Sequence, residues 1–140
     1  AGEEGPADYI WQALDLLKVE RVDHGIRCLD DQELVQRLVA EQMPLTVCPL
    51  SNIRLRAVDT MADHPLPAML EAGLKVSVHS DDPAYFGGYM DANFASLIQT
   101  FNFSTEQLAQ LARNSFESSF IDDSAKRERL AEVDAWVNQR

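Results

Sequence analysis

The sequence holds few cysteines, few basic residues and no long apolar run, and each shortage excludes a class of protein. Its two cysteines, Cys28 and Cys48, form no CxxC pair, which favours a reduced, cytoplasmic protein over a disulfide scaffold. The 12 Lys and Arg residues stand against 23 Asp and Glu residues, so the net charge of −11 argues against nucleic acid as a partner. No apolar stretch approaches the ~18 residues that a membrane-spanning helix needs, and the acidic opening is not typical of a signal peptide.

The residues that are present have the composition of a globular domain, with 46% hydrophobic and 25% charged residues over a length of 140. Apolar residues recur with the period of an amphipathic helix in several segments. Shorter, nearly all-apolar segments lie between them and are typical of strands buried on both faces. Helices are therefore expected over residues 6–18, 30–43, 65–73, 90–101, 104–120 and 123–140, strands over 19–25, 44–49 and 74–80, and a long loop over 51–64.

Two of the expected helices begin with the residues of a capping box. In this arrangement the first side chain and the side chain three residues later each accept a hydrogen bond from the other's backbone N–H. We expect one capping box at Asp30 with Glu33 and another at Ser104 with Gln107.

The alternation of helix and strand predicts an α/β fold with parallel strands joined by crossover helices. Polar residues follow each expected strand directly, as DHG at 23–25, CPLSN at 48–52 and HSDD at 79–82. In folds of this class the binding and catalytic groups lie at the carboxyl ends of the strands. Three polar clusters at the same edge therefore predict a functional site there.

Three strands make a small core, whereas a complete (β/α)8 barrel needs about 250 residues. The sheet is therefore either small and open or part of a larger barrel. The opening AGEEG favours the barrel, because it is typical of a loop that follows a strand whose body is missing. We expect residues 1–140 to form one partial domain, the C-terminal part of an incomplete (β/α)8 TIM barrel, with βα units in 1–90 and C-terminal helices in 91–140.

Two adjacent carboxylates, Asp81 and Asp82, follow the third expected strand. Neighbouring carboxylates repel each other unless something separates or neutralises them, and a metal ion bound by one of them does this. The structural alternative is equally favoured by spacing alone: Asp82 and Pro83 begin a turn, and Asp81 caps the segment that follows.

The histidines also have a functional and a structural interpretation. His24, at a strand end, could be a metal ligand, a general base or a structural residue, and without partners the structural role is favoured. Strand alternation would place His79 on the same face as Asp81 if the strand extends that far. His64, beside Pro65 in the expected loop, is predicted to be a surface residue.

The other candidates are ordinary by pattern alone. Glu3 and Glu4 lie between glycines and are typical of solvated charge. Ser51 either orients a substrate or closes a turn. Cys48 is expected to be a small buried apolar residue rather than a nucleophile.

Four motifs together resemble a known family: AGEEG at 1–5, RVDHG at 21–25, CPLSN at 48–52 and SDDPAYFGG at 80–88. Over roughly residues 1–120 the chain is similar to the C-terminal part of the adenosine/adenine deaminase family, which are metal-dependent (β/α)8 barrels of the amidohydrolase superfamily. CPLSN at 48–52 and DDPAYFGGY at 81–89 resemble the bacterial and fungal adenine deaminase branch more than the adenosine branch.

The resemblance implies a role for each matching residue. Glu3, in the position of the family's HAGE motif, would donate a proton to purine N1. His24 would orient the zinc-bound water and help to deprotonate it. Asp81 would bind the zinc, and Asp82 would accept a hydrogen bond from or near purine N7. His79 stands where relatives often have Asn, and its role stays open.

The activity implied by the resemblance is hydrolysis of adenine to hypoxanthine and ammonia by a zinc-activated water, with one Zn²⁺ per site, as in purine salvage. The family's other zinc ligands, an HxH pair and a histidine directly before the position of Ala1, have no counterpart here. Asp81 is then one of four expected ligands. We expect the chain alone to be nearly inactive, and to pair with the missing N-terminal half of the barrel or with itself.

Two other functions are compatible with the sequence. One is adenosine deaminase, with the same chemistry and room for a ribose. The other is a non-catalytic α/β interaction module whose acids form a solvated surface. Convergence of Glu3, His24, Asp81 and Asp82 in one cleft would count against the module. The H-x-E and P-C-x-x-C signature of cytidine-deaminase-type sites is absent from the sequence.

Overall fold

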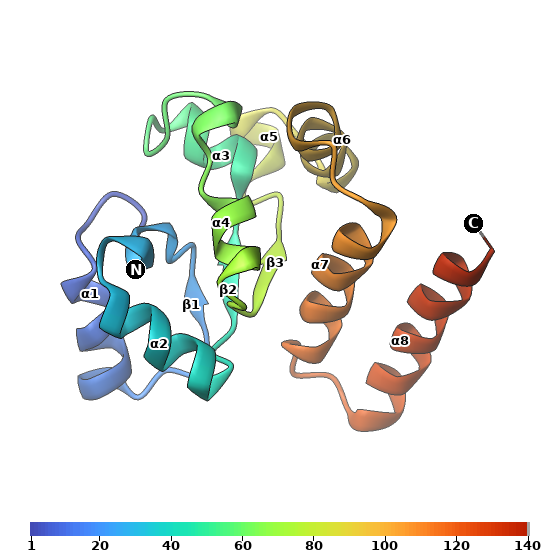
Figure 1. Ribbon diagram of the computed structural model, residues 1–140, viewed down its shortest axis with the longest axis horizontal. Coiled ribbons are helices and arrows are strands. Elements are labelled where there is room, and N and C mark those ends of the chain that lie inside the picture. Colours follow the sequence, from blue (N-terminus) through green and yellow to red (C-terminus); the bar gives the residue numbers. More distant parts are fainter. Residues whose placement is uncertain (140) are drawn as a thin grey trace.

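A computed structural model describes residues 1–139, and a three-stranded parallel sheet lies at its centre (Figure 1). The strands are β1 (Val22–Asp23), β2 (Leu45–Val47) and β3 (Val76–Val78), and they neighbour one another in that order. The predicted parallel pairing is confirmed. The strands are shorter than predicted, and β1 ends early because His24 adopts a left-handed backbone with φ of 64°.

The two faces of the sheet differ in polarity, which corrects the expectation that both are apolar. The face that packs against helices carries only aliphatic side chains, from Val22, Leu45, Val47, Val76 and Val78. The opposite face carries the register row Asp23, Thr46 and Ser77. The hydroxyl of Thr46 donates a hydrogen bond to Asp23 Oδ1 at 2.7 Å, so this inner face is a polar surface.

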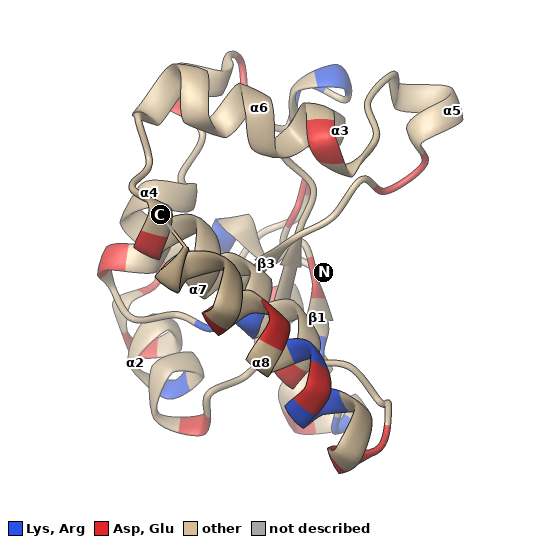
Figure 2. Ribbon diagram, turned by 90° about the vertical axis from the view of Figure 1, so that its right-hand side faces the viewer, with Lys and Arg blue, Asp and Glu red and all other residues tan. Residues whose placement is uncertain are grey.

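Helices cover the apolar face and extend it sideways. α7 lies beside β3, where Asn114 Nδ2 donates to the carbonyl of Val76 at 2.7 Å, and α8 lies outside α7 (Figure 1). Basic and acidic residues are interspersed along α8 (Figure 2), as in the ion pair between Arg129 and Glu132. The helices named here and below are α1 (Asp8–Gln12), α2 (Gln32–Glu41), α4 (Leu66–Glu71), α6 (Met90–Phe101), α7 (Thr105–Glu117) and α8 (Asp123–Asn138).

Several helix boundaries differ from the predictions. α1 continues as a π-helical segment, Ala13–Leu17. The N-cap of α2 is Asp31, whose carboxylate accepts from two backbone N–H groups, whereas Asp30 lies in a preceding 3-10 helix and pairs with Arg27. The capping box of Ser104 and Gln107 is confirmed. The predicted last helix includes residue 140, which lies outside the described residues.

The segment predicted as a long loop is partly helical. It contains most of α3 (Pro49–Arg54) and a 3-10 turn, Met61–Asp63. α3 is too short to show a helical period in the sequence, and Pro49 begins it because proline fits the first turn of a helix. α3, α5 (Pro83–Phe86) and α6 lie together at the end of the sheet where the strands finish, at the top of Figure 1.

The first residues of the chain run beside the end of β1. Ala1 donates its N–H to the carbonyl of Asp23, Gly25 donates to the carbonyl of Ala1, and Arg27 donates to the carbonyl of Gly2. Glu3 therefore leaves the edge of the sheet at the same end as the residues that follow β1. Across residues 1–139, none of the helices combines the length and the apolar character that crossing a membrane requires.

Candidate functional site

The side chains that follow the three strands surround one open hollow of about 370 Å³ at the carboxyl end of the sheet. This is the edge at which the polar clusters after the strands predicted a site. The hollow is lined by Arg21, Asp23, His24, Thr46, Cys48, His79, Ser80, Asp81 and Met90.

His24, which lines this hollow, also contacts Glu3 and Asn52. Asn52 Nδ2 donates a hydrogen bond to Glu3 Oε1 at 2.7 Å and lies 3.4 Å from His24 Nδ1. Glu3 Oε1 and His24 Nδ1 are 3.5 Å apart. The Glu3 and His24 side chains are 18% and 17% exposed, so both are shielded yet reachable from solvent. Sequence reasoning paired neither residue with Asn52.

Asp81 is held by the neighbour of Asn52 on α3. Ser51 Oγ donates to Asp81 Oδ2 at 2.6 Å, a contact that neither expectation for Ser51 included. Asp81 itself has a left-handed backbone, with φ of 57°, so the chain turns sharply there. Consecutive residues of one short helix thus support two site carboxylates, Ser51 for Asp81 and Asn52 for Glu3.

His79 lines the hollow, but strand alternation does not place it there with Asp81, because β3 ends at Val78. Its Nε2 lies 2.8 Å from Ser77 Oγ. Burial, and to a smaller extent the positive charge of Arg21, lower the pKa of His79. The ring is therefore neutral at physiological pH.

His24, Cys48 and Asp81 form a set of donors with a spacing that suits a metal ion. One ligand atom from each lies within 4.8 Å of the others. Imidazole nitrogen, thiolate sulfur and carboxylate oxygen are the ligands that zinc binds in proteins. Burial raises the pKa of the Cys48 thiol to about 12, so the thiol is protonated at neutral pH and is no nucleophile. The residues present fit a zinc ion centred on Asp81.

Asp82 lies away from this group. Its Oδ1 accepts a hydrogen bond from the backbone N–H of Tyr85 at 3.0 Å, so Asp82 is the N-cap of α5. The interpretation that Asp81 caps this segment is wrong. The backbone decides between the neighbours, because an N-cap needs an extended conformation and Asp81 is left-handed.

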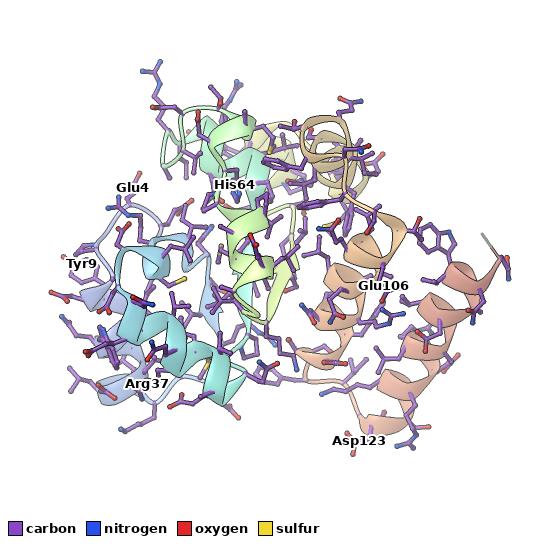
Figure 3. All side chains as sticks on the ribbon, in the orientation of Figure 1. Glu4, Tyr9, Arg37, His64, Glu106 and Asp123 are labelled. Carbon is purple, nitrogen blue, oxygen red and sulfur yellow. The ribbon has the colours of Figure 1, made fainter. Side chains whose placement is uncertain are left out.

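His64 is buried, with 3% of its surface exposed, which contradicts its prediction as a surface residue. It lies just before α4, beside α3 (Figure 3). Its Nδ1 accepts from the backbone N–H of Leu66, and its Nε2 lies 3.1 Å from Asn52 Oδ1. Nothing in the local sequence signals this contact, because an isolated histidine before a proline is typical of a loop.

Burial lowers the pKa of His64 from 6.5 to about 4, which predicts an acid-sensitive stability. The unfolded chain binds a proton at His64 between these pH values and the folded chain does not. The free energy of unfolding is therefore expected to fall by about 3 kcal/mol as the pH decreases through this window, and to be unaffected by His64 above it. Urea titrations at pH 7 and pH 4.5 measure the loss, and His64→Gln should make it smaller. An equal loss in the variant would contradict the assignment.

The sequence is similar to a known protein family and to curated relatives. The family model described as adenosine deaminase matches residues 1–136. The chain is 60% identical over 137 residues to the adenine deaminase of Hahella chejuensis, covering 98% of this chain and 41% of that protein. It is 61% identical over 138 residues to the adenine deaminase of Streptomyces coelicolor, covering 97% and 41%. The chain thus spans about two-fifths of the length of these curated relatives.

The fold of the chain is also similar to solved structures of related proteins. The crystal structure of adenine deaminase from Arthrobacter aurescens matches with a TM-score of 0.97 and 64% identity, over 99% of this chain and 42% of that one. An amidohydrolase from Burkholderia ambifaria, whose structure has bound zinc, matches with a TM-score of 0.89 and 31% identity, over 99% and 39%. The predicted fold class, the C-terminal part of a (β/α)8 barrel, is confirmed.

Proposed function

Because the chain belongs to the adenosine deaminase family, we propose that its site takes part in the hydrolysis of adenine to hypoxanthine and ammonia. One observation carries the proposal. Glu3, His24 and Asp81 converge at one edge of the sheet, in a chain that is 60% identical along 98% of its length to a relative named adenine deaminase.

Asp81 is the proposed zinc ligand of this chain. Its carboxylate reaches the same space as the donor atoms of His24 and Cys48, and Ser51 fixes its orientation through Oδ2. When bound, zinc lowers the pKa of water from 15.7 to ~7 and so supplies hydroxide at neutral pH. The family resemblance assigns one zinc ligand to these residues, whereas catalytic zinc sites use three protein ligands. We therefore propose that residues 1–140 alone do not sustain turnover.

Glu3 and His24 are the proposed proton carriers. Glu3 donates a proton to N1 of the purine. Protonation at N1 makes C6 more electrophilic and so lowers the barrier to attack there. His24 orients the attacking water and accepts its proton. The oxygen of water then bonds to C6, the bond from C6 to the amino nitrogen breaks, and ammonia leaves with the proton that His24 took up. The remaining proton of the C6 hydroxyl returns to the Glu3 carboxylate, which gives the C6 carbonyl of hypoxanthine and restores the acid. The 3.5 Å between Glu3 Oε1 and His24 Nδ1 supports their action on one substrate.

Asp82 is the proposed reader of the purine's five-membered ring. Its Oδ1 is engaged by the N–H of Tyr85, which holds the carboxylate in a fixed direction at the start of α5. Its Oδ2 accepts no hydrogen bond from residues 1–139 and is the atom that would accept one from or near N7. Asp82 follows Asp81 directly, so the proposed metal ligand and base reader occupy successive positions.

Adenosine is the second candidate substrate, since the matching family model is described as adenosine deaminase. The relatives at 60% and 61% identity are both named adenine deaminase, which favours the free base. To decide, kcat/KM is measured for adenine and adenosine on a protein that carries these residues at the full length of the curated relatives. We expect at least a ~10²-fold preference for adenine. A zinc-loaded protein that releases no ammonia from adenine would overturn the proposal.

A further inference from the structure

We propose that His64 is a positioning residue that acts through Asn52 to hold the Glu3 carboxylate in place for proton transfer. The inference rests on the proposed function, because it assigns Glu3 the role of proton donor. It concerns the contact group of Glu3, Asn52 and His64, three side chains from separate segments of the chain. Asn52, on α3, and His64, before α4, are buried, and Glu3, near the start of the chain, is partly exposed.

The hydrogen bonds of His64 determine which of its ring nitrogens carries the proton. Nδ1 accepts from the backbone N–H of Leu66 at 3.1 Å, so this nitrogen has no hydrogen. A neutral ring then carries its hydrogen on Nε2, which lies 3.1 Å from Asn52 Oδ1. His64 is 3% exposed, so no water competes for this contact. His64 therefore donates to Asn52.

This donation selects one of the two orientations of the Asn52 amide. With Oδ1 occupied by His64, Nδ2 faces Glu3 Oε1 at 2.7 Å and donates to it. The flipped amide would place an oxygen against the Glu3 carboxylate and an NH₂ group against the donor of His64. Both contacts would be repulsive. Asn52 is fully buried, so water could not relieve either of them.

Backbone hydrogen bonds hold Asn52 and His64 in place, so the amide orientation that His64 selects is maintained. The backbone N–H of Asn52 bonds to the carbonyl of Cys48 at 2.9 Å, and that of Val58 bonds to the carbonyl of Asn52 at 3.2 Å. On the other side, the N–H of His64 bonds to the carbonyl of Met61 at 3.1 Å. With Oε1 of Glu3 fixed by Asn52, its other oxygen is the one that carries the proton to the purine.

Two conservative variants of His64 separate the two hydrogen bonds of its ring, the one that Nε2 donates to Asn52 and the one that Nδ1 accepts from Leu66. In His64→Asn the shorter amide keeps the contact with the N–H of Leu66 and does not reach Asn52. In His64→Gln the amide nitrogen takes the place of Nε2 and keeps the donation to Asn52. We expect His64→Asn to lower kcat by ~10–100-fold with KM for adenine within about threefold of wild type, and His64→Gln to restore kcat to within about threefold.

The control is another buried amide outside the site. Asn114→Ser removes the bond to the Val76 carbonyl and is expected to lower the thermal midpoint while kcat stays unchanged. Combination with Asn52→Leu completes the test. Because His64 acts only through Asn52, adding His64→Asn to Asn52→Leu should cost no further activity, whereas general damage to the fold would add to it. A multiplicative loss in the double variant would overturn the proposal.

A structural readout keeps this inference separate from the proposed function. Crystal structures of the full-length wild type and of His64→Asn should show the distance between Asn52 Nδ2 and Glu3 Oε1 lengthening beyond hydrogen-bond range in the variant. An unchanged distance would overturn the positioning role whatever the activity. Absence of adenine turnover in the wild type would instead overturn the proposed function, while the measured distance still decides the role of His64.

Discussion

On the proposed function, Asp81→Asn is expected to remove both zinc binding and the deamination of adenine from the full-length protein. The neutral amide is a poor ligand for zinc, and loss of the ion removes several kcal/mol of transition-state stabilisation. We expect kcat to fall on the order of 10⁴-fold, which corresponds to that free energy. Metal analysis of the purified variant, together with initial rates on adenine, measures both effects.

Two further variants test how Asp81 is supported. Ser51→Ala removes the hydroxyl that lies 2.6 Å from Asp81 Oδ2, so it should retain zinc and lose activity by ~10–100-fold. Cys48→Ser should also retain zinc, because the family resemblance assigns the ligand role to Asp81 and not to Cys48. Stoichiometric zinc in Asp81→Asn, or loss of zinc in Cys48→Ser, would transfer the ligand role from Asp81 to Cys48.

The parallel sheet and the edge that carries the site could be predicted from the sequence. Each strand contains buried aliphatic residues, and polar residues follow it directly, as His24 follows β1 and His79 follows β3. Parallel strands place all such ends at one edge, so the location of the site follows from topology alone. The individual roles of Glu3 and Asp81 came from the family resemblance instead.

The contacts among the polar side chains could not be predicted, because they join residues far apart in the sequence. Asn52 contacts Glu3, which precedes it by 49 positions, and His64, which follows it by 12. Neither distance corresponds to a helix or strand period. α3 spans 6 residues, too few for periodicity to reveal a helix or the face on which Asn52 lies.

Which of two adjacent aspartates becomes the N-cap of a helix could not be predicted from the sequence either. Asp30 and Asp31, like Asp81 and Asp82, offer identical side chains at adjacent positions, and local spacing suits either one. The backbone conformation decides, and it is set by the chain's path out of a strand or a 3-10 helix. In both pairs the second aspartate is the extended one and becomes the N-cap.

The alternative of a non-catalytic interaction module loses support from the same geometry. Its test was the scatter of four acidic and imidazole side chains over the surface. Three of them, Glu3, His24 and Asp81, instead lie at one edge of the sheet, whereas Asp82 caps α5. A solvated acidic surface would keep like charges apart, whereas here Glu3 and Asp81 each have their own donor from α3.

Glu3→Gln is expected to lower kcat for adenine by ~10²–10⁴-fold while zinc content and KM change little. Glutamine keeps the size of the side chain and an oxygen that accepts from Asn52 Nδ2, so the contact group of His64, Asn52 and residue 3 stays intact. It has no proton to transfer to the purine. Steady-state kinetics and metal analysis of the full-length variant measure the effect.

The neighbouring glutamate provides the matched control. Glu4 is exposed on the loop at the left of Figure 3, so Glu4→Gln makes the same chemical change one residue away and should leave kcat within twofold of wild type. Equal losses in both variants would show that the charge of the loop matters rather than proton transfer by Glu3. Asp81→Asn should lose zinc and kcat together, whereas Glu3→Gln should lose kcat and keep zinc. This difference would assign metal binding to Asp81 and proton transfer to Glu3 independently.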